Sequence, residues 1–309
     1  AKNKKKTINL LKKINNKSIE IYSKGKKYFA PRYVQELKKI LKNNTNSILL
    51  SGGTDLSLTV TKERKDIDSI IYMNSISELN YIKNNNKYIE VGASTPLIKF
   101  ENYIRKYYPD FTQILKRYGS VQIRNVATMA GNVATASPIG DSLPLLLSLN
   151  AQIVLQEFKK KKILFLDNFF ISYRKTKMKK GQFIHSIKIP LLQKNTFKAY
   201  KVSKRFDDDI SSVCAAFNLE ILKNKVKNVR IAYGGMAAIP KRAFFCEKVL
   251  SNSLITSEII KKAKHALEKD FKPISDMRAS GIYRMEIAKN LLEKCFAEIQ
   301  QKKMIGIYV

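Results

Sequence analysis

The sequence predicts an α+β protein of two domains. The chain has 309 residues, enough for two domains at roughly 100–200 residues each. Runs with strand-like alternation and runs with apolar residues at helical spacing both recur along it. A break near residues 191–197 follows Pro190, where one alternating run ends. We expect the second half to be a compact αβ domain with a three-stranded antiparallel sheet and helices.

The elements of the first half alternate between short strands and helices. Residues 1–27 are rich in Lys and Asn, with few large apolar clusters, which predicts a linker or a loosely docked arm. Pro31 and the helical spacing of Val34, Leu37, Ile40 and Leu41 predict a Pro-initiated helix within 29–44. A short buried strand should follow at 47–51. Further strands are expected at 69–73, 88–94, 151–156, 162–166 and 183–190, and helix at 97–119, interrupted before Pro109.

Three strands and two helices are expected in the second half. The strand candidates are TFKAYKVSKR (196–205), VCAAFNLEI (213–221) and VKNVRIAYGG (226–235). The helix candidates lie near 255–269 and 279–301.

Charge and composition narrow the function classes. The formal net charge is +33, from 58 basic and 25 acidic residues, but most of the cations are lysines scattered through every segment. Arginine is better suited to forked contacts with phosphates and bases, so we expect solvated faces and nonspecific binding of polyanions rather than specific nucleic-acid recognition. No uncharged apolar run approaches the roughly 18–20 residues of a membrane span.

The cysteines and histidines are isolated in the sequence. Cys214, Cys246 and Cys295 form no clustered spacing, which excludes an encoded zinc site or iron–sulfur cluster. A reducing, cytoplasmic compartment is the expectation. His185 and His265 stand alone, which is typical of structural histidines.

A Gly-Gly turn follows the first predicted strand. The run LLSGGTDL occupies residues 49–56. Glycine allows positive φ and close approach of a ligand, and successive N–H groups in such a turn can bind an anion. The spacing is neither that of a P-loop nor that of a Rossmann fingerprint, so the run by itself indicates a tight turn.

Residues 122–144, QIRNVATMAGNVATASPIGDSLP, are small and almost uncharged. A core helix favours larger apolar groups and a strand favours β-branched alternation, so this composition indicates close approach of the backbone to a bulky ligand. Thr128, Asn132, Thr135 and Ser137 can form hydrogen bonds, and Asp141 could accept two hydroxyl protons from a ribityl or ribose unit. Main-chain N–H groups can hold a diphosphate without cations.

These two loops carry a resemblance to a known family. AGNVATASPIGDSLP (130–144) resembles the flavin-binding motif of the molybdenum hydroxylases, the xanthine dehydrogenase and carbon monoxide dehydrogenase superfamily, and SGGTDLSLTVTK (51–62) resembles its first FAD loop. The similarity extends in order over roughly residues 28–300 and is strongest to the FAD-binding part of the xanthine dehydrogenase small subunit. The further matching runs are YGSVQIRNVAT, FFISYRKT, YKVSKRFDDDISSV, YGGMAAIPKRA and DFKPISDMRASGIYR.

The resemblance implies a fold and a set of site residues. The fold is a two-subdomain FAD-binding fold of the PCMH (vanillyl-alcohol-oxidase-like) type over 28–192, followed by a carbon monoxide dehydrogenase flavoprotein-like domain over 197–302. Lys201 would lie at the flavin ring edge, and Asp208 would line the flavin and nicotinamide side. The other implied cofactor-binding residues are Leu49, Leu50, Ser51, Gly52, Gly53, Thr54, Asp55, Leu56, Tyr118, Thr128, Gly131, Asn132, Asp141 and Ile184.

The resemblance also implies a role in electron transfer. Electrons from purine hydroxylation at a molybdenum centre would pass through iron–sulfur clusters to FAD on this chain and then to NAD⁺. The molybdopterin-binding subunit and the iron–sulfur domain or subunit would be partners in a hetero-oligomer. The alternatives are the flavin subunit of an aldehyde, nicotinate or carbon monoxide hydroxylase, a cofactor-free scaffold, or a nonspecific nucleic-acid binder.

Two features depart from the family pattern. The chain lacks the cluster-binding cysteines that usually precede the flavin domain, so residues 1–27 would be the remnant of a connecting linker and the clusters would lie elsewhere. Ala130 stands where the family commonly has glycine. If residue 130 needs positive φ, alanine costs on the order of 1 kcal/mol, and Ala130→Gly should bind FAD equally well or more tightly.

Overall fold

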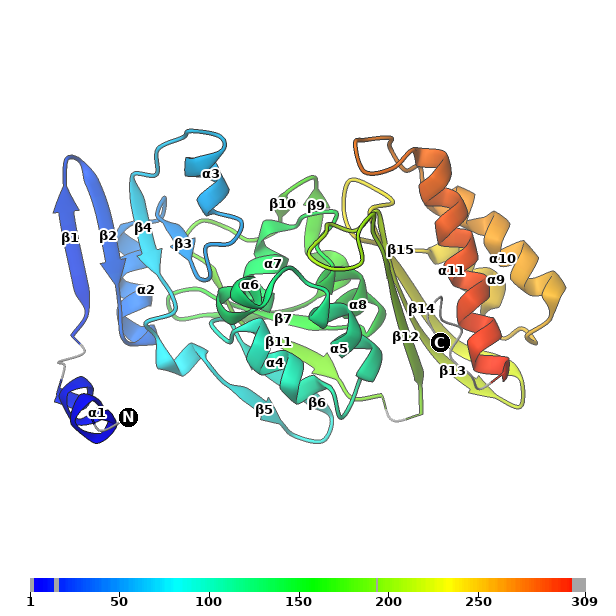
Figure 1. Cartoon of the computed structure of the whole chain (residues 1–309), viewed down its shortest axis with the longest axis horizontal. Coiled ribbons are helices and arrows are strands. Elements are labelled where there is room, and N and C mark those ends of the chain that lie inside the picture. The colour runs from blue at the N-terminus through cyan, green and yellow to red at the C-terminus, as the bar shows by residue number, and fades with distance from the viewer. Residues whose placement is uncertain (1–2, 14–16, 193, 302–309) are drawn as a thin grey trace.

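Three parts follow one another along the long axis of the molecule (Figure 1). The structure is a computed structural model that describes residues 3–13, 17–192 and 194–301. A small N-terminal sheet lies at one end, an αβ part with five antiparallel strands lies in the middle, and a sheet backed by helices lies at the other end. Within the described residues, no helix has both the length and the apolar character needed to cross a bilayer.

The N-terminal sheet has the strand order β1-β2-β4-β3. Its strands are β1 (Ile19–Ser23), β2 (Lys26–Ala30), β3 (Ile48–Leu50) and β4 (Ser69–Tyr72). The β1–β2 pair is antiparallel, whereas β2 and β3 both run parallel to β4. Helix α2 (Val34–Asn43) packs Leu37 and Leu41 against Phe29 and Ile71 of the sheet. The remaining helices of this region are α1 (Lys4–Lys13) and α3 (Ser57–Thr61).

The structure gives residues 1–27, predicted as a linker or a loosely docked arm, secondary structure that the prediction did not include. Residues 19–27 belong to the β1–β2 hairpin, and residues 4–13 form α1, whereas residues 1–2 and 14–16 lie outside the described residues. All five residues of β1 are exposed, because β1 is an edge strand without a core-facing side. A strand of this kind leaves no buried periodicity in the sequence.

The central sheet has the order β5-β6-β11-β7-β8, and every neighbouring pair is antiparallel. Its strands are β5 (Ile82–Asn84), β6 (Tyr88–Gly92), β7 (Gln152–Gln156), β8 (Lys161–Phe165) and β11 (Phe183–Pro190). The short elements beside it are η1 (Ser77–Leu79), η2 (Leu166–Asn168), β9 (Phe170–Ser172) and β10 (Lys175–Thr176).

Five helices cover this central sheet. They are α4 (Leu97–Ile104), α5 (Pro109–Lys116), α6 (Val121–Val126), α7 (Met129–Thr135) and α8 (Ser142–Ser148). The small-residue stretch, residues 122–144, is therefore largely helical, although its composition was interpreted as a loop whose backbone lies close to a bulky ligand. Thr128 caps α7 by accepting a hydrogen bond from the Gly131 N–H at 3.0 Å, and Ala136 ends it in the left-handed region at φ 47°. Cap chemistry and tertiary packing thus outweighed the lack of large apolar residues.

The C-terminal sheet has the antiparallel order β12-β13-β14-β15. Its strands are β12 (Thr196–Val202), β13 (Val213–Leu222), β14 (Lys225–Gly234) and β15 (Lys241–Arg242), and its helices are α9 (Phe244–Leu250), α10 (Ser257–Asp270) and α11 (Gly281–Gln301). Two elements go beyond the prediction of three strands and two helices. They are the two-residue strand β15 and the helix α9. Both are too short to produce a clear periodic signal.

This sheet is buried on both faces. Cys214 and Ala216 of β13 belong to the core of the central part, whereas Val213, Ala215 and Phe217 belong to the core beneath the C-terminal helices. Helix α8 packs against β13 and β14, and α9 and α11 pack on the strands from the other side. Because successive side chains of a strand point to opposite faces, β13 contributes to both cores, and this sheet connects the two domains.

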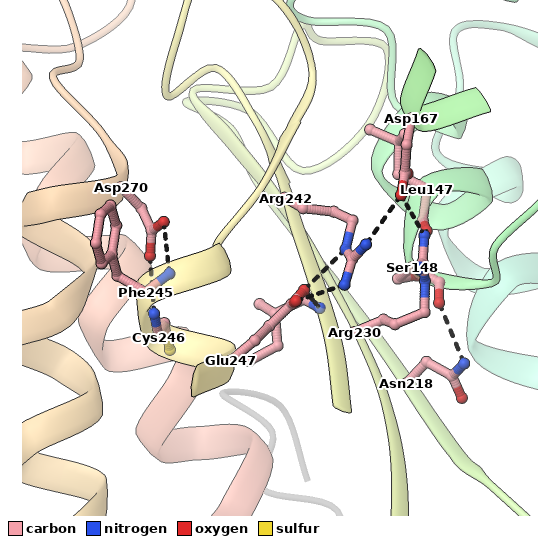
Figure 2. A network of polar contacts seen from close by, with 11 residues as sticks. Leu147, Ser148, Asp167, Asn218, Arg230, Arg242, Phe245, Cys246, Glu247 and Asp270 are labelled. Atoms are coloured by element: carbon pink, nitrogen blue, oxygen red, sulfur yellow. Dashed lines mark hydrogen bonds and ion pairs between the residues drawn. The ribbon is translucent and has the colours of Figure 1, made fainter. Parts of the chain in front are cut away.

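A polar network joins α8 and η2 to the C-terminal sheet (Figure 2). Asp167 accepts hydrogen bonds from Arg230 at 2.8 Å and from Arg242 at 2.9 Å. Arg242 also pairs with Glu247 of α9, at 2.5 Å. Burial raises the pKa of Glu247, and Arg242 opposes that rise. Removing one member would therefore leave partly buried charges without their partner.

The same network fixes the C-terminal end of α8. Arg230 donates to the Leu147 carbonyl at 2.9 Å, and Asn218 donates to the Ser148 carbonyl at 3.1 Å. These carbonyls are at the helix end, where intrahelical partners are lacking. Both donors lie on the C-terminal sheet, so the end of α8 is fixed to that sheet.

Candidate cofactor-binding site

Two adjacent cavities, a main chamber and a side chamber, are lined by residues of the N-terminal sheet, α7 and the C-terminal sheet. The main chamber has a volume of about 470 Å³ and the side chamber about 350 Å³. Both volumes fall in the range typical of small-molecule sites. The chambers share Leu49, Ser51, Gly131 and Ala134 in their walls and therefore lie next to each other.

The first wall of the main chamber is the turn after β3. Gly53 has φ +72°, in the left-handed region that favours glycine. Gly52 lies so close to the next wall that a Cβ there would be 2.2 Å from the Val126 carbonyl oxygen. The carboxylate of Asp55 accepts two hydrogen bonds from Arg174, at 2.8 and 3.2 Å. The turn is therefore held from both sides while its main chain borders the cavity.

The second wall runs from Tyr118 to Asp141. Burial, followed by the negative charges of Asp141 and Asp55, raises the pKa of the Tyr118 phenol, so its ring borders the chamber in the neutral form. On α7, the Asn132 side chain accepts a hydrogen bond from the Ser142 hydroxyl at 2.6 Å. That bond connects α7 to the first residue of α8 and places the Asn132 amide at the cavity.

The third wall contains a buried ion pair. The Lys201 ammonium lies 2.7 Å from Asp141 Oδ2 and 2.9 Å from the Arg117 carbonyl oxygen. The Ser211 hydroxyl donates to Asp141 Oδ1. Both carboxylate oxygens therefore already accept a hydrogen bond from this chain. Each can still accept one more, so the proposed contact of Asp141 with cofactor hydroxyls remains available.

A loop of residues 203–210 forms the outer rim. Arg117 donates to the Phe206 carbonyl and to the Lys201 carbonyl, both at 2.9 Å, and to the Ser203 hydroxyl at 3.2 Å. Its guanidinium also lies over the Phe206 ring, 4.4 Å from the centroid. Asp208 is exposed on this rim with φ 51°, a conformation that Asp adopts more readily than most residues.

The side chamber is mainly apolar. Its walls include Met73, Ala130 and Ile184, and Lys179 and Lys180 also line it. Ala130 is the second residue of α7 and is not among the residues with positive φ. The condition under which alanine would be strained at position 130 is therefore not met. The left-handed residue of this segment is Ala136.

The structure brings all the residues suggested by the sequence to these two chambers. Ile184 borders the side chamber, and the others border the main chamber. The main-chamber residues are Leu49, Leu50, Ser51, Gly52, Gly53, Thr54, Asp55, Leu56, Tyr118, Thr128, Gly131, Asn132, Asp141, Lys201 and Asp208. Two further residues, Arg117 and Ser211, escaped sequence reasoning. A single arginine and a single serine leave no local pattern, and only the tertiary contacts show what they hold.

The chain matches two known families along its length. Residues 20–192 match the family described as the FAD binding domain in molybdopterin dehydrogenase. Because this match covers more than half of the chain, it decides the family. The chain belongs to the molybdopterin dehydrogenase FAD-binding family. Residues 198–299 match the CO dehydrogenase flavoprotein C-terminal domain, so the family's two-domain arrangement extends through the C-terminal sheet.

Individual relatives within this family differ in their activities and lengths. A xanthine dehydrogenase of Emericella nidulans is 31% identical over 271 residues, which cover 81% of this chain but only 19% of that protein. The glyceraldehyde dehydrogenase medium chain of Sulfolobus acidocaldarius is 29% identical over 88% of this chain and 97% of its own length. The chain thus spans about a fifth of the first relative and nearly all of the second.

Solved structures have the same fold. A carbon monoxide dehydrogenase from Hydrogenophaga pseudoflava, which lacks the Mo-pyranopterin moiety of the molybdenum cofactor, superimposes with a TM-score of 0.82 at 22% identity. The match covers 88% of this chain and 96% of the other. The α+β architecture of an FAD-binding domain followed by a C-terminal domain is therefore the one that the sequence predicted.

Proposed function

We propose that the two chambers together bind one FAD and that the chain transfers electrons from iron–sulfur clusters through FAD to NAD⁺ in a xanthine dehydrogenase-type molybdenum hydroxylase. The observation that supports this proposal is the convergence of three separate segments, 49–56, 118–141 and 201–210, on the main chamber. The similarity to a xanthine dehydrogenase over 81% of the chain supports the choice of enzyme.

The residues of the cavity fit the parts of FAD. The main-chain N–H groups of the Gly52–Gly53 turn suit the diphosphate, because successive N–H groups can bind an anion without cations. The neutral ring of Tyr118 suits stacking on the flat isoalloxazine. The apolar side chamber, with Met73 and Ile184, suits the adenine. Thr128, Asn132 and Asp141 offer hydrogen bonds to the hydroxyl-bearing portion between them.

The chain's own residues would bind and orient the cofactor rather than act as acids or bases. When bound, FAD supplies the ability to exchange single electrons with clusters and a hydride with nicotinamide. Lys201 would stabilise negative charge at the polar edge of the ring. Asp208, on the exposed rim, would lie on the side where the nicotinamide approaches.

The proposed partners carry the other centres. Iron–sulfur clusters and molybdopterin would reside on partner segments or subunits in a hetero-oligomer. The match to nearly the full length of a medium chain supports a separate flavin subunit. The buried thiols Cys214, Cys246 and Cys295 support a reducing, cytoplasmic setting.

A second candidate function differs in the substrate of the molybdenum partner. The match to a glyceraldehyde dehydrogenase medium chain favours an aldehyde-oxidising enzyme, in which the flavin subunit would do the same work. Assays of the assembled enzyme with xanthine and with an aldehyde discriminate the two. Turnover of xanthine supports the first candidate, and turnover of the aldehyde alone supports the second.

The experiment for the core proposal uses the purified chain. FAD titration, followed by fluorescence quenching and by the flavin absorbance spectrum, should give one site per chain. Anaerobic NADH should then bleach the flavin band. A chain that binds no FAD would overturn the proposal and favour a scaffold. A band shift with nucleic acid that survives high salt would favour nucleic-acid binding. FAD binding without bleaching by NADH would overturn only NAD⁺ as the acceptor.

A further inference from the structure

Three side chains from separate segments meet beneath the main chamber. Lys201 comes from the end of β12, Asp141 precedes α8, and Ser211 precedes β13. They are 7%, 5% and 1% exposed, respectively. They form a connected set, in which Lys201 and Ser211 each donate to a different oxygen of Asp141. We refer to these three residues as the Lys201 triad.

The Lys201 triad carries little net charge although it contains an ammonium. Burying an isolated charge is costly, and the carboxylate 2.7 Å away offsets that cost. An ammonium has three N–H groups. Among the described residues, two of the three are engaged, by Asp141 and by the Arg117 carbonyl, which leaves one for a ligand in the cavity. A ligand there experiences the net electrostatic potential of the Lys201 ammonium and the Asp141 carboxylate. That potential depends on how the charge of each group is distributed.

Ser211 changes this net potential through Asp141. Its hydroxyl draws negative charge toward Oδ1, the carboxylate oxygen that does not contact Lys201. Without this donor, the carboxylate charge would concentrate near Lys201 and screen its ammonium more completely. Without the carboxylate charge itself, the ammonium would act on the chamber unscreened. The two changes therefore have opposite effects on a ligand that gains negative charge.

We infer that Ser211 is a positioning residue that, through Asp141, sets how strongly Lys201 stabilises the reduced flavin, and thereby sets the reduction potential of the bound cofactor. The inference rests on the proposed function, since it requires FAD in the main chamber. It concerns a residue that lines neither chamber. Its effect passes entirely through the carboxylate of Asp141 to the ammonium of Lys201.

The test compares the two-electron midpoint potentials of the FAD-loaded full chain. Asp141→Asn should raise the potential, with at least a tenfold change in the equilibrium constant for reduction, or about 30 mV for a two-electron couple. Ser211→Ala should lower it, with a change of about threefold. Ser211→Cys retains a weaker donor of similar size and should give an intermediate potential. Ser212→Ala, the neighbouring buried serine whose carbonyl accepts from Arg284, is the matched control and should leave the potential unchanged.

FAD dissociation constants and unfolding midpoints, measured on the same proteins, separate a change of potential from a loss of structure. Shifts of opposite sign in Asp141→Asn and Ser211→Ala support the inference. Unchanged potentials, or shifts of the same sign, in variants that bind FAD would overturn it and leave the proposed function standing. Failure of the unmodified chain to bind FAD would overturn both.

Discussion

Arg117 and Lys201 each donate a hydrogen bond to the other's main-chain carbonyl, and both bonds are 2.9 Å long. Arg117 follows α5 of the central part, and Lys201 is the second-to-last residue of β12 in the C-terminal sheet. This reciprocal pair connects the two domains at the rim of the cavity. It also fixes the point at which the loop 203–210 leaves the sheet.

Replacing Arg117 should loosen that loop. Arg117→Met retains an unbranched side chain but loses three hydrogen-bonded contacts and the interaction with the Phe206 ring. We expect FAD affinity to fall by roughly tenfold, about 1.4 kcal/mol, because the loop borders the main chamber. Trypsin should also cleave faster after Lys204 and Arg205. Arg105→Met, at an exposed arginine after α4, should change neither quantity, and equal FAD affinity in both variants would contradict the role of the loop contact.

Gly52 should tolerate a side chain less well than Gly53. A Cβ at Gly52 would meet the Val126 carbonyl at 2.2 Å, so one of the two cavity walls must move. A Cβ at Gly53 would meet only the Leu50 side chain, at 3.3 Å, and the cost is mainly the left-handed backbone. We expect Gly52→Ala to destabilise the fold by more than about 2 kcal/mol, against about 1 kcal/mol for Gly53→Ala. Urea unfolding measures both.

The control for this pair is Gly25, in the turn between β1 and β2. Its φ is +77°, and a Cβ there meets nothing within 4 Å. Gly25→Ala should show the backbone cost while leaving FAD binding unchanged. Comparable FAD dissociation constants for Gly25→Ala and Gly52→Ala would show that the contact between the two walls does not shape the site.

Glycine should have different effects at positions 130 and 136. Ala130 lies inside α7, where glycine is less favourable than alanine by about 1 kcal/mol, so Ala130→Gly should destabilise the protein and should not tighten FAD binding. Ala136 is left-handed and fully buried, so Ala136→Gly relieves backbone strain but removes a packed methyl group. These effects nearly cancel, and we expect a change within about 0.5 kcal/mol. Tighter FAD binding by Ala130→Gly, seen by isothermal titration, would contradict the helical geometry.

Alkaline pH should weaken the fold partly through Tyr81. Burial raises the pKa of Tyr81 to about 12, and its hydroxyl donates to Glu90 at 3.0 Å. The folded state therefore retains this proton at pH values where the unfolded chain, with a pKa near 10, has lost it. The stabilisation is complete below pH 10 and is lost as the pH rises from 10 to 12.

Urea midpoints measured from pH 8 to pH 11.5 test this expectation. Tyr81→Phe should start from a slightly lower midpoint, because one hydrogen bond is lost, and should fall less steeply with pH. Tyr22→Phe, at an exposed tyrosine, should follow the unmodified protein. A slope for Tyr81→Phe as steep as that of the unmodified protein would show that Tyr81 does not contribute.

The sequence predicted those parts of the fold that carry a strong periodic or chemical signal. The strands β6, β7, β11, β13 and β14 alternate or form apolar runs, and they lie where expected. Strand β1 was missed because an exposed edge strand has no core-facing pattern. Helix α7 was missed because a capping threonine and tertiary packing determine it rather than its own side chains.

The residues of the candidate site likewise divide into those that belong to a local sequence motif and those that do not. Its glycine- and threonine-containing loops were recognisable as linear motifs, and they converge on one cavity. The contacts of Ser211 and Arg117 join residues 70 and 84–89 positions apart in the chain, and no local pattern encodes them. The sequence raised the cost of alanine at residue 130 only if that residue needed positive φ, and the residue within 122–144 that has positive φ is Ala136, which no local pattern marked.

Helix α8 has one further consequence. The helix is short, yet its start carries Asp141 and its end accepts hydrogen bonds from Arg230 and Asn218, so both ends are attached to the C-terminal sheet. The two family matches divide the chain between residues 192 and 198, but the cavity uses residues from both sides of that division. The complete site therefore requires both matched regions of the chain. In a chimera that takes its C-terminal domain from a relative, Asp141 and Arg117 remain but Lys201, Ser211 and the loop 203–210 are replaced, so the incoming domain must supply matching partners to complete the site.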